Sequence, residues 1–441
     1  MKPVKQKKQG ISAPQLQPRA DTNGKFTLKE LRTNGARLRA DIQELACIGR
    51  TPEGALTRHA FSPAYEQARK WLKDRMHEAG MTVRDDAVGN IIGRIGHDDA
   101  ACVMAGSHID TVTDGGPLDG ALGVLAALEV ARVIREVSIE IPLAFECVAF
   151  IEEEGRYLGR LGSKAMTGEL DLASVENAID PTGYKLTAAM RSVGFNPSRI
   201  SQARRSADSI SAYVELHIEQ GPVLEQVGVP IGIVGAMVGI NHTRVTFYGE
   251  PDHAGTTPMD LRKDAFAGAA EYAYLARRLV LDEGTQGEAR ITFGVVDLKP
   301  QVANVIPYQV LLLQEVRDVS DAVIARLTAR ASDIANEVAA KHRLKVRHEP
   351  VGKNRAVTMS GRVRNVIRES AAALGLETHD MTSGAAHDAQ IMAQIVPGGM
   401  IFVPSARGRS HRRDEWTDWG YLEQGANVLL HTVLRLLCSD R

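Results

Sequence analysis

The sequence predicts an α/β protein with a mixed, mostly parallel sheet, helices on both faces of that sheet, and an inserted α+β domain. Three observations support this prediction. Short apolar runs alternate with amphipathic helical stretches, which is typical of parallel α/β units. Several of these runs end in polar clusters, and the middle of the chain follows a different order of elements.

The first elements come from the part of the chain before residue 224. Residues 101–106 are an apolar run that predicts a buried strand, and residues 120–137 predict the helix after it. Residues 143–151 and 212–216 predict two further strands. Each run has the length of a strand rather than of a helix, so this part of the chain predicts a buried parallel sheet.

The middle of the chain has a different pattern. Residues 231–249 are rich in β-forming residues, and residues 261–280 are Ala-rich and helical. The elements that follow are two strands, a helix and a strand, at residues 289–296, 310–316, 321–341 and 344–348. This order predicts a compact α+β unit rather than further βα repeats.

The α/β pattern returns in the last part of the chain, with a helix, a strand and a terminal helix at residues 362–374, 400–404 and 422–437. We therefore predict that an inserted domain, residues 224–350, divides a discontinuous domain of residues 25–223 and 351–441. Residues 1–24 are basic and polar and lack the apolar segment of a secretory signal, which predicts a disordered leader.

The composition gives no indication of a nucleic-acid or membrane partner. The formal net charge of the 441 residues is -1, and no apolar run is long enough to span a bilayer. The four cysteines, Cys47, Cys102, Cys147 and Cys438, form no CxxC pair. Cys102 and Cys147 lie in apolar runs, which predicts buried free thiols and favours a cytoplasmic setting.

Polar side chains follow three of the predicted strands. His108 and Asp110 follow the first, Glu153 and Glu154 the second, and His217 the third. Because open α/β sheets bind ligands beyond the carboxyl ends of their strands, we expect these side chains at one site. A single strand-end histidine is more often a loop residue, and a Glu triplet is usually a solvated cluster. Their convergence on one sheet edge favours metal binding.

Two further positions complete a set of ligands without sulfur. Asp119 follows a Gly-Gly-Pro turn that can return its carboxylate to the same edge, and a late histidine, His411 or His387, supplies a last nitrogen. Such a set suits zinc, and also manganese, cobalt or nickel.

Seven segments also carry a family resemblance. They are, in chain order, GSHIDTVTDGGPLDGALGVLAALEV, FIEEEG, ELHIEQGPVLE, GEPDHAGTTPM, NVIP, SGAAHDAQ and FVPSARGRSHRRDEWTD. Together they resemble the M20-type metallohydrolases, in the branch of N-carbamoyl-L-amino acid hydrolase, β-ureidopropionase and allantoate amidohydrolase. The resemblance covers nearly all of the chain after the leader, and it implies that the inserted domain is a lid and dimerisation domain.

The resemblance implies two divalent metal ions per subunit, with zinc as the expected metal. His108 and His217 would hold one ion, Glu154 and His411 would hold the other, and Asp119 would bridge both. A histidine at position 217 favours the carbamoyl branch, because peptidase relatives usually carry a carboxylate there.

The resemblance also implies the residues that act on the substrate. Glu153 would be the general base, and Asp110 would orient His108. His253 would reach the site from the lid of a partner subunit, which implies a homodimer. Taken alone, His253 is a turn histidine.

The remaining implied residues would bind the substrate. Asn304 and Arg317 would bind its carboxylate, Gln220 would contact its ureido group, and His387 would face it. Taken alone, Arg317 is an ordinary surface arginine. Glu315 stands where the family usually has Asp, and residues 240–243 lack the Gln-Arg-Arg-like run of allantoate enzymes.

These features predict an enzyme that hydrolyses an N-carbamoyl-L-amino acid, a small ureido compound, to the amino acid, ammonia and carbon dioxide. Allantoate and 3-ureidopropionate are the main alternative substrates, followed by the N-acylated substrate of an aminoacylase-type amidase. A non-catalytic scaffold of the same fold should have lost the base or a metal ligand. Every such position is filled here.

Overall fold

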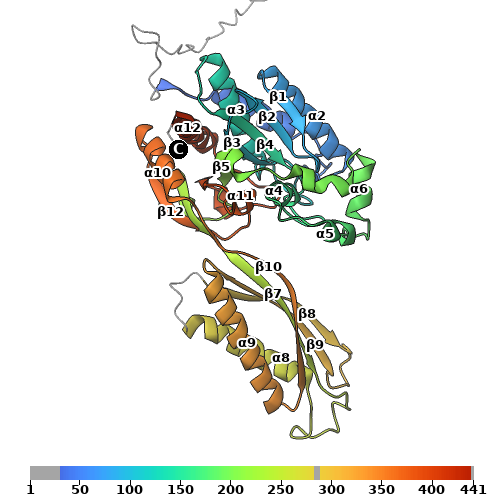
Figure 1. The fold of residues 1–441 in the computed structure, drawn as a ribbon. Helices are drawn as coiled ribbons and strands as arrows, with labels where there is room; N and C mark the ends of the chain where they lie inside the picture. Colours follow the sequence, from blue (N-terminus) through green and yellow to red (C-terminus); the bar gives the residue numbers. More distant parts are fainter. Residues whose placement is uncertain (1–29, 283–288, 439–441) are drawn as a thin grey trace, which may run out of the picture.

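A computed structural model describes residues 30–282 and 289–438, arranged around two sheets (Figure 1). The predicted leader, residues 1–24, lies outside the described residues. The larger sheet contains β1 (Thr82–Asp85), β2 (Ile91–Ile95), β3 (Cys102–His108), β4 (Ala144–Phe150), β5 (Ile210–Ile218), β6 (Ile231–Met237), β11 (Val357–Thr358), β12 (Thr378–Ser383) and β13 (Gly398–Val403).

The strand order is β1-β2-β4-β3-β5-β13-β6-β11, with β12 also pairing with β6. The central strands β4, β3, β5 and β13 are parallel to one another, and antiparallel pairs lie toward the edges. The predicted mixed, mostly parallel sheet is therefore confirmed. The carboxyl ends of β3, β4 and β5 lie at one edge of the sheet, as expected from the polar residues that follow these strands.

Helices cover both faces of the larger sheet (Figure 1). The described helices of this domain are α1 (Gly35–Leu45), α2 (Pro63–Glu78), α3 (Ala121–Glu136), α4 (Leu161–Thr167), α5 (Leu172–Asn177), α6 (Leu186–Ser192), α7 (Val223–Val227), α10 (Gly361–Ala373), α11 (Asp388–Met392) and α12 (Trp419–Cys438). Short 3-10 turns lie at Pro197–Ala203, Ala207–Ser209 and Ala406–Gly408. None of the described helices is both long and apolar enough to cross a membrane.

The alternation of side chains along β3 divides the core between the two faces. Val103 and Ala105 belong to the larger hydrophobic cluster, which also contains side chains of α3, α10 and α12. Cys102 and Met104 belong to a second cluster with side chains of α4 and α11. Successive strand residues point to opposite faces, so a strand that is buried on both sides is apolar throughout. Cys102 and Cys147 are buried free thiols, as predicted.

The second sheet forms the inserted domain. Its strands are β7 (Gly239–Tyr248), β8 (Arg290–Lys299), β9 (Gln309–Asp318) and β10 (Lys345–Asn354), in the order β10-β7-β9-β8, and all neighbours are antiparallel. Helices α8 (Ala265–Asp282) and α9 (Asp321–Lys341) pack on one face of this sheet (Figure 1). Their apolar side chains form a separate core.

The chain enters the inserted domain later than the boundary at residue 224 that the sequence predicts. The β-rich stretch 231–249 is two strands, and β6 pairs with β12 and β13 in the larger sheet. The second sheet begins only at Gly239 and ends at Asn354. A Cβ atom at Gly239 would lie 2.6 Å from the backbone nitrogen of Ala356. The two chain crossings therefore approach each other closely at this glycine, a tertiary contact that strand propensity does not indicate.

Candidate metal centre and active site

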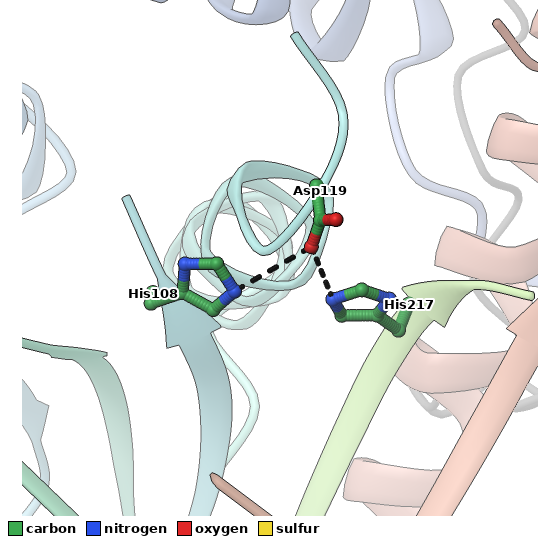
Figure 2. Close-up of side chains that lie close together, drawn as sticks. All are labelled: His108, Asp119 and His217. Carbon is green, nitrogen blue, oxygen red and sulfur yellow. Dashed lines mark ion pairs between the residues drawn. The ribbon is translucent and has the colours of Figure 1, made fainter. Parts of the chain in front are cut away.

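Asp119 lies at the centre of the polar residues that follow the strands. Its Oδ1 atom is 3.1 Å from Nε2 of His217 and 3.6 Å from Nε2 of His108 (Figure 2). Its Oδ2 atom is 3.2 Å from Nε2 of His411, which lies 3.5 Å from Oε2 of Glu154. The two oxygens of one carboxylate therefore face two different groups of ligand atoms.

The fold brings these residues together from distant parts of the chain. His108 is the last residue of β3, and His217 lies near the end of β5, which pairs with β3. Asp119 directly precedes Gly120, the N-cap of α3, whose φ is 65°. A Cβ atom at Gly120 would lie 2.4 Å from the imidazole of His108. Glycine at this turn therefore permits both the left-handed backbone and the close approach of the ring.

The donor atoms fit divalent metal ions. In each of two groups, His108, Asp119 and His217, and Asp119, Glu154 and His411, the potential ligand atoms lie within 4.8 Å of one another. All are nitrogen or carboxylate oxygen, which zinc and other first-row divalent ions accept. The buried Oε1 atom of Glu154 has no hydrogen-bond partner among the described residues. A carboxylate oxygen without a donor in a buried site is suited to a cation.

The acidic residues of the site are strongly perturbed. Burial, with the charges of Asp110 and Asp119, raises the pKa of Glu153 to about 7. Burial and the charge of Asp119 raise the pKa of Glu154 to about 10. Burial opposes ionisation of Asp119 as well, but the imidazoles of His108, His217 and His411 hold its pKa well below its usual range. A divalent ion would displace the protons on these imidazoles.

Asp110 makes a different contact from the expected one. The Nδ1 atom of His108 lies 3.0 Å from the backbone carbonyl oxygen of Asp110 and 3.7 Å from its carboxylate. The carboxylate instead accepts the backbone N–H groups of Glu153, at 3.3 Å, and of Glu154, at 3.1 Å. The carbonyl of Asp110 thus orients the ring of His108, and its side chain fixes the adjacent glutamates.

Gln220 and Ser410 complete the surroundings of Asp119. Nε2 of Gln220 donates to Oδ2 of Asp119 at 2.7 Å. The hydroxyl of Ser410 lies 2.7 Å from the same oxygen and 2.7 Å from Oε2 of Glu415. The Oε1 atom of Glu415 accepts the backbone N–H of Leu118 at 2.8 Å and of Asp119 at 3.1 Å. The contact of Glu415 with the Asp119 turn was not predicted from the sequence.

His387 lies beside the metal-ligand groups. Its ring centroid is 4.5 Å from that of His217, and its buried Nε2 atom has no partner within the described residues. Burial and the neighbouring His217 hold its pKa well below the usual range. His387 also joins a third possible ligand group with His217 and Glu215. Sequence reasoning missed Glu215, although its spacing of two from His217 puts both side chains on one face of β5.

The predicted lid residues divide into two sets. Arg317 lies at the end of β9 near the domain crossing, and its Nη1 atom donates to the carbonyl of Gly384 at 2.8 Å. Its Nε and Nη2 atoms bind both carboxylate oxygens of Glu315, at 2.6 and 3.1 Å. Arg317 therefore reaches the loop that leads to His387 but is already paired with Glu315.

His253 and Asn304 lie at the other end of the inserted sheet. They belong to connections that follow β7 and precede β9, where Tyr248 pairs with Gln309. The backbone N–H of Ala254 donates to the carbonyl of Asn304, and His253 is exposed. These two residues are adjacent to each other, at the sheet end opposite the domain crossing. The fold of one subunit does not bring them to Asp119.

The chain is similar to known proteins in sequence and in fold. Residues 104–435 match the family described as Peptidase family M20/M25/M40. The chain is 38% identical over 414 residues to the N-carbamoyl-L-amino acid amidohydrolase of Geobacillus stearothermophilus, covering 91% of this chain and 98% of that protein. It is 34% identical over 399 residues to the allantoate amidohydrolase of Bacillus subtilis, covering 90% of this chain and 96% of that protein. The crystal structure of an amidase of the hydantoinase/carbamoylase family from Burkholderia multivorans is 34% identical, with a TM-score of 0.84 over 93% of this chain and 99% of that one.

Proposed function

Because the chain belongs to the peptidase family M20/M25/M40, we propose that it hydrolyses the carbamoyl C–N bond of N-carbamoyl-L-amino acids. It is a hydrolase of the carbamoylase and allantoate amidohydrolase type. The products would be the L-amino acid, ammonia and carbon dioxide. The observation that carries the proposal is the position of Asp119, whose two oxygens face two nitrogen-containing ligand groups.

The family is metal-dependent, and the ligand groups around Asp119 fit this requirement. We propose two ions per subunit, with zinc as the resident metal. His108 and His217 would hold one, Glu154 and His411 would hold the other, and Asp119 would be shared. When bound, such ions lower the pKa of water and polarise a carbonyl oxygen.

Glu153 is the proposed general base. Its Oε2 atom lies 3.7 Å from Nε2 of His108, at the edge of the ligand group. A pKa of about 7 lets this carboxylate take a proton from water and return it to the departing nitrogen near neutral pH. Asp110 would hold the backbone of Glu153, and His387 would face the substrate with its free nitrogen.

Substrate recognition would need the lid. We propose that Arg317 exchanges its contacts with Glu315 for the substrate carboxylate, because its planar guanidinium suits bidentate contact. We also propose that Gln220 contacts the ureido group. His253 and Asn304 lie at the distal end of their own lid, so a partner subunit is the proposed source of these two residues. This arrangement makes the homodimer the active species.

Allantoate is the second candidate substrate, because the B. subtilis allantoate amidohydrolase has nearly the same identity and coverage as the carbamoylase. The absence of a Gln-Arg-Arg-like run at residues 240–243 favours the carbamoyl amino acid.

One substrate panel tests the proposal. Ammonia release should be measured from N-carbamoyl-L- and D-amino acids, 3-ureidopropionate and allantoate, with metal-stripped protein and after reloading with zinc, manganese or cobalt. We expect metal-dependent turnover of the L-carbamoyl compounds and little turnover of the D-compounds. Turnover of allantoate alone would reassign the substrate, and inactivity of the metal-loaded protein toward the whole panel would contradict the proposal.

A further inference from the structure

A second pocket lies at the junction between the two sheets, outside the candidate metal centre. It has a volume of about 390 Å³, and its lining includes Arg160, Glu169, Lys353, Arg355, Gln390 and Gln394. These residues flank the two ends of α4, or come from the end of β10 and the crossing after it, or from α11 with its following turn. The pocket therefore touches both the catalytic domain and the strand that returns from the inserted domain.

The charges of this pocket are unbalanced. Arg160, Lys353 and Arg355 are cations, and Glu169 is the one acidic residue in the lining. Among residues 30–282 and 289–438, no ion pair joins any of these three cations to a carboxylate. Other arginines of this domain do have such partners, including Arg94 and Arg205, whose guanidinium groups both bind Glu146. A pocket that keeps three cations without carboxylate partners has an electrostatic preference for an anion.

Gln390 connects this pocket to the crossing between the domains. Its side-chain Nε2 donates to the carbonyls of Val238, at 2.9 Å, and Arg355, at 2.8 Å. Val238 lies between β6 and β7, and Arg355 lies between β10 and β11, so this amide holds both chain crossings. Its Oε1 atom accepts Nη1 of Arg160 at 2.9 Å. One buried side chain thus joins a pocket cation to the two segments about which the lid would turn.

The pocket also has a direct path to the active site. The backbone N–H of Arg160 donates to the carbonyl of Glu153 at 3.0 Å. Gln390 lies in α11, whose N-cap residue is His387. A ligand that fixes Arg160 and Gln390 would therefore also fix the segments that carry the base and a substrate-facing histidine.

We propose that this pocket binds a small phosphate-bearing anion, and that binding favours one orientation of the inserted domain. Guanidinium groups and a lysine ammonium are the side chains that bind phosphate oxygens best. The amides of Asn354 and Gln394, also in the lining, supply further donors. Arg355 and Lys353 move with the strand leaving the lid, whereas Arg160 belongs to the catalytic domain. An anion held by both sides shifts the equilibrium toward the lid orientation in which they are close.

The experiment is calorimetric titration of the metal-loaded full chain with inorganic phosphate at constant ionic strength. The pocket variant is Lys353→Gln with Arg355→Gln, and the matched control is Lys345→Gln with Arg347→Gln. The control removes two cations from β10, the strand that contains Lys353, outside the pocket lining. Phosphate that binds at the metal centre would bind equally in both variants.

We expect one phosphate-binding event that weakens roughly tenfold or more in the pocket variant and is retained in the control. Equal phosphate binding by wild type and pocket variant would overturn the proposed site. Equal weakening in both variants would also overturn it, because the attraction would then be unspecific. Small-angle scattering tests the lid orientation: phosphate should change the radius of gyration of wild type and control but not of the pocket variant. An unchanged radius in wild type would refute that part of the proposal.

Discussion

The carboxylate of Glu415 accepts the backbone N–H of Asp119 at 3.1 Å, across 296 positions of sequence. It also accepts the N–H of Leu118 and contacts the hydroxyl of Ser410. Through these contacts a residue near the end of the chain fixes the turn that carries the proposed bridging ligand. The polar centre is therefore held by its surroundings as well as by the strands that supply its histidines.

Replacing Glu415 tests this support directly. Loss of a residue that positions a metal ligand by hydrogen bonds typically lowers metal affinity by about 10- to 100-fold. We therefore expect Glu415→Ala to weaken zinc binding by that factor. Competition with a chromophoric chelator measures the affinity. Glu369→Ala, at an exposed position of α10, is the control. Unchanged zinc affinity in the Glu415 variant would exclude a positioning role.

The general-base assignment predicts a separation between activity and metal binding. Glu153→Gln should lower kcat by about 10²- to 10⁴-fold, because the amide cannot take the proton from water. Metal content, measured by atomic absorption, should stay at the wild-type value. Glu176→Gln, on the exposed side of α5, should have wild-type kcat. A Glu153 variant with undiminished kcat would require another base.

Removal of metal should lower stability as well as activity. Asp119, Glu153 and Glu154 are buried or nearly buried together, and a bound cation would reduce their mutual repulsion. A ligand that binds only the folded state at 100 times its Kd contributes about 2.7 kcal/mol. We therefore expect a lower Tm after chelation, restored by zinc or manganese. An identical Tm before and after stripping, with metal loss verified, would contradict the proposed centre.

Arg317 offers a test of substrate recognition. Arg317→Lys keeps the charge but removes the fork that can bind a carboxylate through two hydrogen bonds. Hydrogen bonds to charged groups contribute about 1.5–3 kcal/mol, so kcat/KM should fall by about 10- to 100-fold, mainly through KM. Arg347→Lys, on β10, serves as the control. If kcat/KM is the same for both variants, Arg317 does not bind the substrate.

The ion pairs of Glu146 predict that the free energy of unfolding depends on pH, independently of the active site. Burial would raise its pKa, but the guanidinium groups of Arg205 and Arg94 outweigh burial and lower the pKa below its ordinary value of 4.5. The ionised carboxylate of Glu146 therefore contributes its full stabilisation of the folded state above about pH 4.5. This contribution is lost as the pH falls through the lower pKa of the folded state.

Glu146→Gln should cost roughly 3 kcal/mol of unfolding free energy at pH 7, because it leaves two largely buried guanidinium groups without their carboxylate. Urea unfolding of wild type and variant at pH 7 and pH 4 measures the difference, which should shrink at the lower pH. A difference that grows on acidification would mean that the sign of this linkage is wrong.

The sequence by itself determined the central part of the fold and the chemistry of the candidate site. Apolar runs buried on both faces identified β3, β4 and β5, and the polar residues after them identified one sheet edge. These predictions succeeded because a strand that is buried on both faces is apolar along its whole length, and because the ligands follow directly after the strands. The inserted α+β unit was also predictable, since α8 and α9 are amphipathic and long. The short elements α4 to α7, α11, β11 and β12 were not predicted, because they are too short to show a period. The elements before residue 101, α1, α2, β1 and β2, were not predicted either.

Only the tertiary structure decided which residues meet. It separated β6 from β7 at Gly239, because the nearby crossing leaves no room for a side chain there. It brought Glu415 to the Asp119 turn and Arg317 to the carbonyl of Gly384, contacts between positions that are far apart in the sequence. It also gathered Arg160, Lys353 and Arg355 around Gln390. Spacing along a chain reports periodic burial within one element, whereas contacts between separate elements depend on how those elements pack.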